Sequence, residues 1–381
     1  MKTILLKNAS AILPGRRSKN TSVLIENGTI ANISGQENDA DEIIDLTGST
    51  LFAGFIDIHN HGAVGVDVNN ATGDDLKTVG KFLAENGVTA WLPTLVPDSE
   101  ENYRKSIDAI EDAINIQEND AAAQILGVHY EGVFANEKMC GALRPQFFKS
   151  FKSGDEIESL PKLENGIHFT TLAPEVENAI ELIKKLTGEN WIVSIGHTRA
   201  DPATLDRAFS AGAKHFTHFF NAMTGIHHRD FGVAGWALTK EEATFDIIAD
   251  GIHVHPAMLK FACRTKSSDK VSLISDSVAP AGLGDGDFEI WGEKVSVTGG
   301  KTRNERGSIA GSVISMLDAV RMMLSLGFSD VEVSQMASAN PAKLLGIDQD
   351  YGTIEIGKRA DLVALDGNGN VKMVLIGGKI F

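Results

Sequence analysis

Hydrophobic and polar positions alternate over short stretches at both ends of the chain, a pattern typical of β-strands. Near the N-terminus the predicted strands are residues 3–6, 22–26, 29–33 and 42–45. Asn27-Gly28 lies between two of them and predicts a tight hairpin turn. The stretch from Gly352 to Phe381 has the same character, as strand, turn and strand. We therefore expect one small β-sandwich domain formed by residues 1–53 together with 352–381.

Residues 54–351 repeat a different unit, in which a helix is followed by a glycine and then a strand. Thr72, with Asp75 three residues later, predicts the start of the first such helix. The same unit recurs over 174–197 and 202–220, and a hairpin over 288–303 is predicted as an insertion. Such repeats predict a parallel sheet, and most economically an α/β fold with a (β/α)8 TIM-like barrel. A doubly wound open sheet is the alternative, although the chain has no glycine-rich nucleotide-binding motif to favour it.

Composition narrows the class of partner. The 381 residues carry a formal net charge of −16 without a long basic run, which argues against nucleic acid and an anionic membrane surface as partners. The only two cysteines, Cys140 and Cys263, form no CxxC pair, and this usage is typical of a reducing cytoplasm. No signal-peptide core is apparent, and no apolar run approaches the roughly 20 residues of a membrane span. We expect a cytoplasmic protein.

The segment from Phe55 to Gly62 is the most informative stretch, because it predicts a short buried strand that ends in His59-Asn60-His61. Residues two apart in a strand point to the same side, so His59 and His61 can bind one metal ion, with Asp57 behind them. Imidazole suits zinc, iron, nickel and copper. The pair alone is weak evidence, since two polar residues that merely close a strand give the same pattern.

Other predicted strands also end in metal-ligating residue types. Functional groups of a barrel of this kind lie at the C-terminal ends of its strands. The strand ends carry, in chain order, His59 and His61, Glu131, His197, His218, His253 and Asp276. Each residue alone is as readily structural, but together they supply the nitrogen and carboxylate ligands of zinc or iron. The histidines at 129, 168, 215 and 255 are interpreted as packing, rim or loop residues.

These motifs, in this order, resemble the amidohydrolase superfamily, and within it the family of N-acetylglucosamine-6-phosphate deacetylases. The resemblance spans nearly the whole chain, through Ala53–Gly62, Gly127–Gly132, Thr171–Glu175, Gly196–Thr198, Thr217–Met223, His227–Arg229, Asp250–Val254, Ser275–Pro280, Ile309–Ser312 and Gly352–Val363. The Phe-Asn-Ala-Met and His-His-Arg stretches are specific to the deacetylase branch.

The resemblance implies metal-dependent hydrolysis of the N-acetyl group of N-acetylglucosamine-6-phosphate to glucosamine-6-phosphate and acetate. The implied ligands are Glu131, His197 and His218 for one ion, and His59 and His61 for a second, with Glu131 bridging. Some members of the family use a single ion, so one or two divalent metals are expected. Zinc is the first choice, with iron, nickel, manganese or cobalt as alternatives. Asp276 is implied as the catalytic group that takes a proton from water and gives it to the leaving amine.

The resemblance also implies how an amino sugar phosphate is held. Arg229 is implied to pair with the phosphate, because a guanidinium matches a phosphate bidentately. In the family this arginine comes from the other subunit, which implies a homodimer. The other implied substrate-binding residues are Ala142, Leu143, Asn221, Ala222, His228, His253 and Ile309.

Three positions depart from the family pattern near the expected substrate. Val133 stands where proline is usual, Met139 where a basic residue is common, and Leu143 where histidine or glutamine is expected. Leucine forms no hydrogen bond, and Arg144 is a candidate to reach in instead. The alternatives are therefore deacetylation of another acetamido sugar or an N-acyl amino acid, and a catalytically silent sugar-phosphate-binding homologue. Asp276 argues against the silent homologue, which has no need of a proton-transfer carboxylate.

Overall fold

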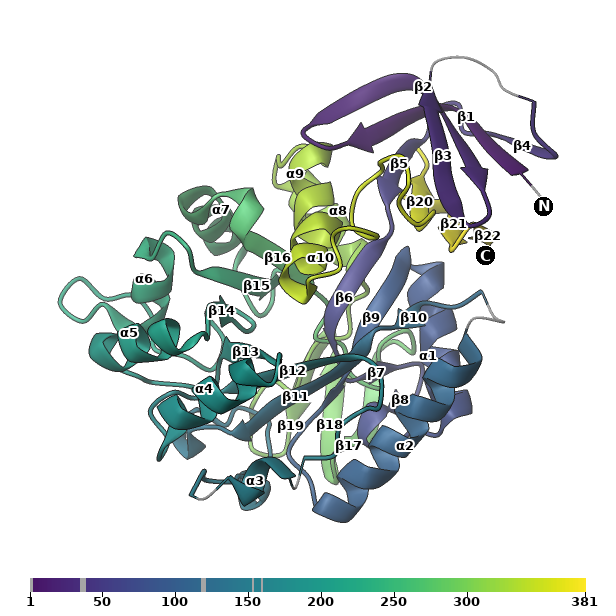
Figure 1. Cartoon of the computed structure of the whole chain (residues 1–381). Helices are drawn as coiled ribbons and strands as arrows, with labels where there is room; N and C mark the ends of the chain where they lie inside the picture. The colour runs from purple at the N-terminus through teal and green to yellow at the C-terminus, as the bar shows by residue number, and fades with distance from the viewer. Residues whose placement is uncertain (1–2, 35–38, 118–120, 153, 159) are drawn as a thin grey trace.

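A parallel barrel and a separate sheet made from both chain ends organise the molecule (Figure 1). The structure is a computed structural model that describes residues 3–34, 39–117, 121–152, 154–158 and 160–381. The predicted fold class is confirmed. The division of the chain into a terminal domain (1–53 with 352–381) and a barrel domain (54–351) stays a prediction.

Eight parallel strands form the barrel. In spatial order they are β6 (Phe55–Asn60), β9 (Val88–Leu95), β11 (Gly127–Phe134), β12 (Ile167–Leu172), β13 (Ile192–Ile195), β14 (His215–Phe216), β15 (Thr244–Ile248) and β16 (Val271–Ile274). The short strand β10 (Gln124–Ile125) also pairs with β9. The barrel closes just beyond β16, where the Asp276 N–H donates to the His59 carbonyl at 2.9 Å and the His61 N–H donates to the Ser277 carbonyl at 2.8 Å. The closure thus brings the ends of β6 and β16 together.

Helices cover the outside of the barrel (Figure 1). They are α1 (Gly73–Glu85), α2 (Glu100–Ile116), α3 (Asp155–Glu158), α4 (Ala179–Gly188), α5 (Pro202–Ala211), α6 (Gly232–Thr239), α7 (Pro256–Lys266), α8 (Met316–Ser325), α9 (Asp330–Ser334) and α10 (Asn340–Leu345). Thr72 and Asp75 form the predicted capping box at the start of α1. The helix expected from residue 174 begins only at Ala179, after Asn178 in a left-handed conformation. Within the described residues, no helix combines the length and apolar character needed to cross a membrane.

The sheet at the chain ends contains β1 (Thr3–Leu13), β2 (Arg16–Glu26), β3 (Thr29–Ser34), β4 (Glu42–Asp45), β5 (Thr50–Ala53), β20 (Leu362–Leu365), β21 (Val371–Ile376) and β22 (Lys379–Ile380). The two ends join because β5 pairs antiparallel with β20. A cluster of its own, including Leu6, Val23 and Leu362, is fully buried between these strands. Asn27 and Gly28 form the predicted hairpin turn, with φ of 54° and 80°.

A small antiparallel sheet is inserted after β16. It consists of β17 (Gly286–Ile290), β18 (Glu293–Thr298) and β19 (Lys301–Asn304), one strand more than the predicted hairpin. Its buried residues Ile290 and Val295 pack against Val278 and Ala310, which flank the end of the barrel. A second, shorter hairpin of β7 (Gly62–Ala63) and β8 (Val66–Asp67) follows β6. Both insertions therefore stand over strand ends that carry the candidate site residues.

Candidate active site

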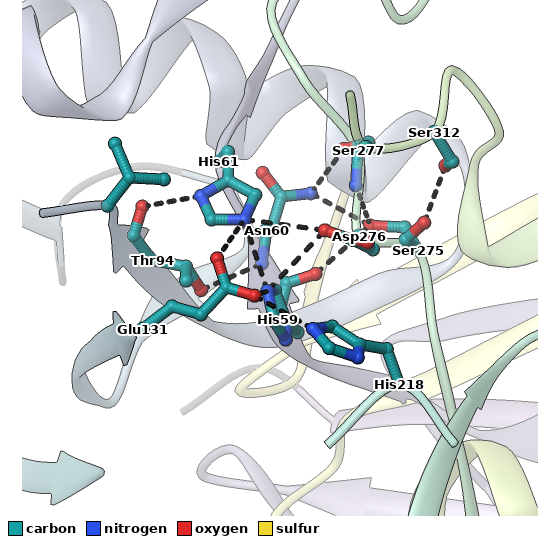
Figure 2. A network of polar contacts seen from close by, with 12 residues as sticks. His59, Asn60, His61, Thr94, Glu131, His218, Ser275, Asp276, Ser277 and Ser312 are labelled. Carbon is teal, nitrogen blue, oxygen red and sulfur yellow. Dashed lines mark hydrogen bonds and ion pairs between the residues drawn. The ribbon is translucent and has the colours of Figure 1, made fainter. Parts of the chain in front are cut away.

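The strand-end residues predicted from the sequence form two adjacent groups inside the barrel mouth. One group is His59, His61 and Asp276, and the other is Glu131, His197 and His218; within each, the ligand atoms lie within 4.8 Å of one another. All six side chains are buried. Five come from the ends of β6, β11 and β13 and from the turns after β14 and β16, and His61 follows β6 directly. Figure 2 shows most of them converging on one point.

Glu131 lies between the two groups. Its Oε1 atom is 3.0 Å from His197 Nε2 and 2.9 Å from His218 Nε2. Its Oε2 atom faces the other way and lies 3.3 Å from His61 Nε2. Glu131 therefore contacts histidines of both groups, and the bridging role implied by the resemblance stays a prediction.

Backbone carbonyl groups orient two of the histidines. The Nδ1 atom of His61 is 3.1 Å from the Thr94 carbonyl, and that of His197 is 2.8 Å from the Met139 carbonyl. A carbonyl accepts a hydrogen bond only from a protonated nitrogen, so each ring presents an unprotonated Nε2 when it is neutral. Met139 therefore orients His197 through its main-chain carbonyl. This contact does not depend on the side chain, which is methionine where the family commonly has a basic residue.

The turns that aim these residues are conformationally costly. His197, His218 and Asp276 have positive φ values of 48°, 34° and 49°. Residues other than glycine and asparagine rarely adopt this region, and such outliers cluster at functional sites. The fully buried Asp246 supports one of the turns, because its carboxylate accepts the His218 N–H and also contacts His215 Nε2 at 3.0 Å.

Asp57 stabilises the seam between β6 and β16 behind the site. Its carboxylate accepts hydrogen bonds from Ser275 Oγ at 2.5 Å and Asn60 Nδ2 at 3.1 Å. Asn60 Nδ2 also donates to Ser277 Oγ at 2.8 Å (Figure 2). Burial raises the pKa of Asp57, against the effect of these hydrogen bonds. The network fixes the chain on both sides of Asp276, as a buried, fully bonded polar cluster does.

The histidines and carboxylates shift each other's pKa values. Burial would lower the pKa of His61, but hydrogen bonds and charge from Asp276 and Glu131 raise it to about 10. Burial would also lower the pKa of His218, but the hydrogen bond and the charge of Glu131 outweigh burial and raise this pKa to about 9. Burial acts to raise the pKa values of Glu131 and Asp276. The neighbouring histidines, of which His59 has the largest effect, hold both values below the ordinary range. The site is thus strongly polar and favours bound positive charge.

Both groups fit a divalent metal ion by their donor chemistry. In each group two imidazole Nε2 atoms approach one another, at 3.1 Å for His59 and His61 and 3.0 Å for His197 and His218. Two neutral imidazoles gain nothing from such an approach unless a proton or cation lies between them. Imidazole nitrogen with carboxylate oxygen is the donor set of zinc and of other first-row divalent metals.

A cavity of about 300 Å³ opens above the two groups. It is lined by His61, Glu131, His197, His218 and Asp276, together with Gly141, Ala142, Leu143, Asn221, Ala222, His253, Trp291, Ser308, Ile309 and Gly311. Six of the eight predicted substrate-binding residues therefore line it. A larger hollow of about 510 Å³ elsewhere, between Ile114 and Lys379, has no carboxylate, histidine or cysteine among the described residues that line it.

The remaining two predicted substrate-binding residues, His228 and Arg229, lie outside this cavity. Both are exposed, in a loop between β14 and α6. The rings of His227 and His228 pack on each other, with centroids 4.3 Å apart. A single chain therefore does not bring Arg229 to the site, and its role stays a prediction.

Leu143 and Arg144 have packing roles that the sequence did not reveal. Leu143 is 2% exposed and packs so closely on Gly132 that a side chain at 132 would meet its Cδ1 atom at 2.3 Å. Arg144, the candidate to reach into the cavity, instead forms an ion pair with Asp98 at 2.6 Å and lies over the ring of Phe147. The expectation for Arg144 was wrong, because its partner lies 46 residues earlier in the chain.

Sequence reasoning missed Trp291, Ser308, Gly141 and Gly311, which also line the cavity. The inserted hairpin was predicted, but its turn was given no role. The sequence signal that could have identified Trp291 is its position before Gly292. A tight turn usually has asparagine or glycine there, not a bulky residue.

The chain is similar to known proteins along nearly its whole length. Residues 50–381 match the model of the amidohydrolase family. N-acetylglucosamine-6-phosphate deacetylase of Bacillus subtilis (strain 168) is 36% identical, over 99% of this chain and 97% of its own. N-acetylgalactosamine-6-phosphate deacetylase of Escherichia coli O157:H7 is 36% identical over 87% of each chain. A mutant of the Mycobacterium smegmatis N-acetyl-D-glucosamine-6-phosphate deacetylase in complex with N-acetyl-D-glucosamine-6-phosphate has a TM-score of 0.90 at 26% identity, covering 100% of this chain and 99% of that one.

Proposed function

We propose, since this chain belongs to the amidohydrolase family, that it hydrolyses the N-acetyl group of N-acetylglucosamine-6-phosphate to give glucosamine-6-phosphate and acetate. The observation that carries the proposal is the pair of histidine–carboxylate groups at the floor of a cavity large enough for a sugar. Relatives with this activity in their names match nearly the full chain.

Metal ions belong to the proposed mechanism, because the family is metal-dependent. Glu131, His197 and His218 would hold one ion, and His59 with His61 would hold a second beside Asp276. We propose zinc, which takes this donor set in catalytic sites. When bound, a divalent ion there lowers the pKa of a water molecule and polarises the acetamide carbonyl.

Asp276 is the proposed proton carrier. Its Oδ1 atom lies 3.3 Å from His61 Nε2 and its side chain lines the cavity. Asp276 accepts a proton from the attacking water as the water oxygen bonds to the acetyl carbon. The same carboxyl group then gives this proton to the sugar nitrogen as the C–N bond breaks. Acetate and the free amine are the products.

The sugar is proposed to lie toward β14 and β15, against Asn221, Ala222 and His253. His253 Nδ1 is 2.6 Å from the Asp250 carboxylate, which fixes the ring and leaves Nε2 for the substrate. The polar wall formed by these residues suits neutral hydroxyl groups rather than charge.

The phosphate requires a cation, and the described residues that line the cavity include neither lysine nor arginine. We propose a homodimer in which Arg229 of the second copy pairs with the phosphate. The exposed loop around it carries Ile226 at 44% and Phe231 at 45% exposure. Such apolar groups gain from burial against a partner. A cytoplasmic location is also proposed, in keeping with the two unpaired cysteines.

Acetate release tests the proposal directly. The purified protein, reconstituted with zinc and with its metal content measured, is offered N-acetylglucosamine-6-phosphate, N-acetylglucosamine and N-acetylgalactosamine-6-phosphate. We expect efficient, phosphate-dependent turnover of the first. A metal-loaded protein that releases no acetate from it would refute the proposal. Faster turnover of the galacto epimer would instead align this chain with the relative from Escherichia coli.

A further inference from the structure

One aromatic residue in the cavity wall, Trp291, is not used by the proposed mechanism. Trp291 and Gly292 form the two-residue turn between β17 and β18, with φ of 54° and 78°. Asn27 and Gly28 form the same turn in the terminal sheet, with φ of 54° and 80°. Type I′ turns of this kind favour asparagine, aspartate or glycine at the first position. Tryptophan is thus the wrong residue for the turn alone, and backbone strain at such an outlier points to function.

The side chain of Trp291 lies against the candidate metal site. Its ring meets that of His61 edge-on, with centroids 5.1 Å apart. The same ring packs beside Ala142 on the cluster that anchors the inserted sheet. The indole Nε1 atom is buried and has no hydrogen-bond partner within the described part of the chain. Buried indole N–H groups usually find an acceptor, so this group lacks the partner expected of it.

The topology indicates which end of a substrate Trp291 meets. Asn221 and His253 follow β14 and β15, whereas Trp291 touches His61 at the end of β6, beyond β16. A substrate with its sugar over β14 and β15 and its amide at Asp276 directs its acyl group toward β6. The wall there is apolar, because Ala142 and Leu143 also line it.

We propose that Trp291 is a specificity-determining substrate contact that forms the wall of the acyl pocket. Its ring packs against the acetyl methyl group and limits acyl length. The proposal rests on the proposed deacetylase function and adds the residue that selects an acetyl group over longer acyl chains.

Two variants test the ring as a wall. Trp291→Gly removes the wall and suits a positive φ, so the turn remains intact. Trp291→Phe keeps most of the wall. Phe288→Leu is the matched control, because Phe288 lies in the same sheet and lines a groove outside the cavity. Each protein is assayed with the N-acetyl and N-propionyl derivatives of glucosamine-6-phosphate, and its thermal midpoint is measured.

We expect Trp291→Gly to raise the propionyl-to-acetyl ratio of kcat/KM by about tenfold or more, since one methylene is worth roughly that factor in a fitted pocket. Its thermal midpoint should not fall. Trp291→Phe, which keeps an aromatic wall, should leave the ratio close to that of the wild-type protein. Phe288→Leu should change neither value.

An unchanged ratio in Trp291→Gly, whether both substrates slow equally or neither slows, overturns the acyl-pocket assignment and leaves the proposed function standing. Failure of the wild-type protein to release acetate overturns the proposed function itself.

Discussion

The strand ends of the barrel and the loops above them carry similar residue types but hold them in different ways. His59 and His218 are at most 4% exposed, and each contacts a carboxylate from another strand. His228 and Arg229, in the loop after β14, are exposed and have no charged partner among the described residues. Contacts at the strand ends hold the first set in place, whereas the second set lies outside the cavity of its own chain.

The largest effect is expected at a strand end. Asp276→Asn keeps the shape and the backbone hydrogen bonds at the seam but removes the proton carrier. We expect kcat to fall by about 10²–10⁴-fold, the range for loss of a general acid–base group. Metal content, measured by elemental analysis, should stay at the wild-type level. Turnover close to wild type in this variant would contradict the assigned role of Asp276.

The next effect tests the loop. Arg229→Ala should raise KM for the phosphorylated substrate by about 10–100-fold, because charge-assisted hydrogen bonds are the strong ones. Hydrolysis of unphosphorylated N-acetylglucosamine should hardly change. Arg104→Ala is the matched control, since this arginine is also exposed but lies on α2 and was not assigned to the substrate. Equal losses for both sugars would remove the phosphate assignment.

A mixture of two impaired variants can show whether Arg229 acts across subunits, when the phosphorylated substrate is kept well below the KM of Arg229→Ala. Asp276→Asn and Arg229→Ala chains are unfolded, mixed and refolded together. In a mixed dimer, one site then combines Asp276 of one chain with Arg229 of the other, and acetate release should recover. No recovery, with mixed dimers demonstrated by mass spectrometry, would place Arg229 in its own subunit's site or outside both.

A smaller effect, on the pH dependence of thermal stability, should follow from removal of metal. His61 and His218 have pKa values raised to about 10 and about 9 in the metal-free fold, above their ordinary value. Their contribution to stability is therefore complete below about pH 6.5 and is lost as the pH rises through 9 to 10. Glu131 and Asp276 have lowered pKa values, so their contribution to stability is complete at pH values above the ordinary pKa of a carboxyl group. It is lost as the pH falls below that range. The thermal midpoint of chelated protein should fall between pH 7 and pH 10, and zinc should raise it at every pH.

The same contrast explains what the sequence could predict. Period-two alternation and the placement of strand ends in a barrel selected seven residues, of which six form the two buried groups and the seventh, His253, lines the cavity. Arg144 could not be placed, because its position depends on Asp98, which lies across the fold. Trp291 could not be placed either, since the angle at which the inserted sheet meets His61 is set by packing on Val278 and Ala310. The role of Arg229 stays a prediction, because this residue lies outside the cavity of its own chain.

The smallest effect compares two turns of the same geometry. Trp291→Asn gives the inserted sheet the turn sequence that the terminal sheet already has, and should raise the free energy of unfolding by about 1 kcal/mol, the lower end of the cost of such strain. Asn27→Trp is the mirror change and should lower it by a similar amount. Chemical denaturation measures both. If Trp291 lowers the stability of the fold and is also required for acyl selection, its presence at this turn is explained by substrate binding and not by folding. If Trp291→Asn destabilises instead, the ring serves the packing of the sheet, and the strain at this turn has a structural cause.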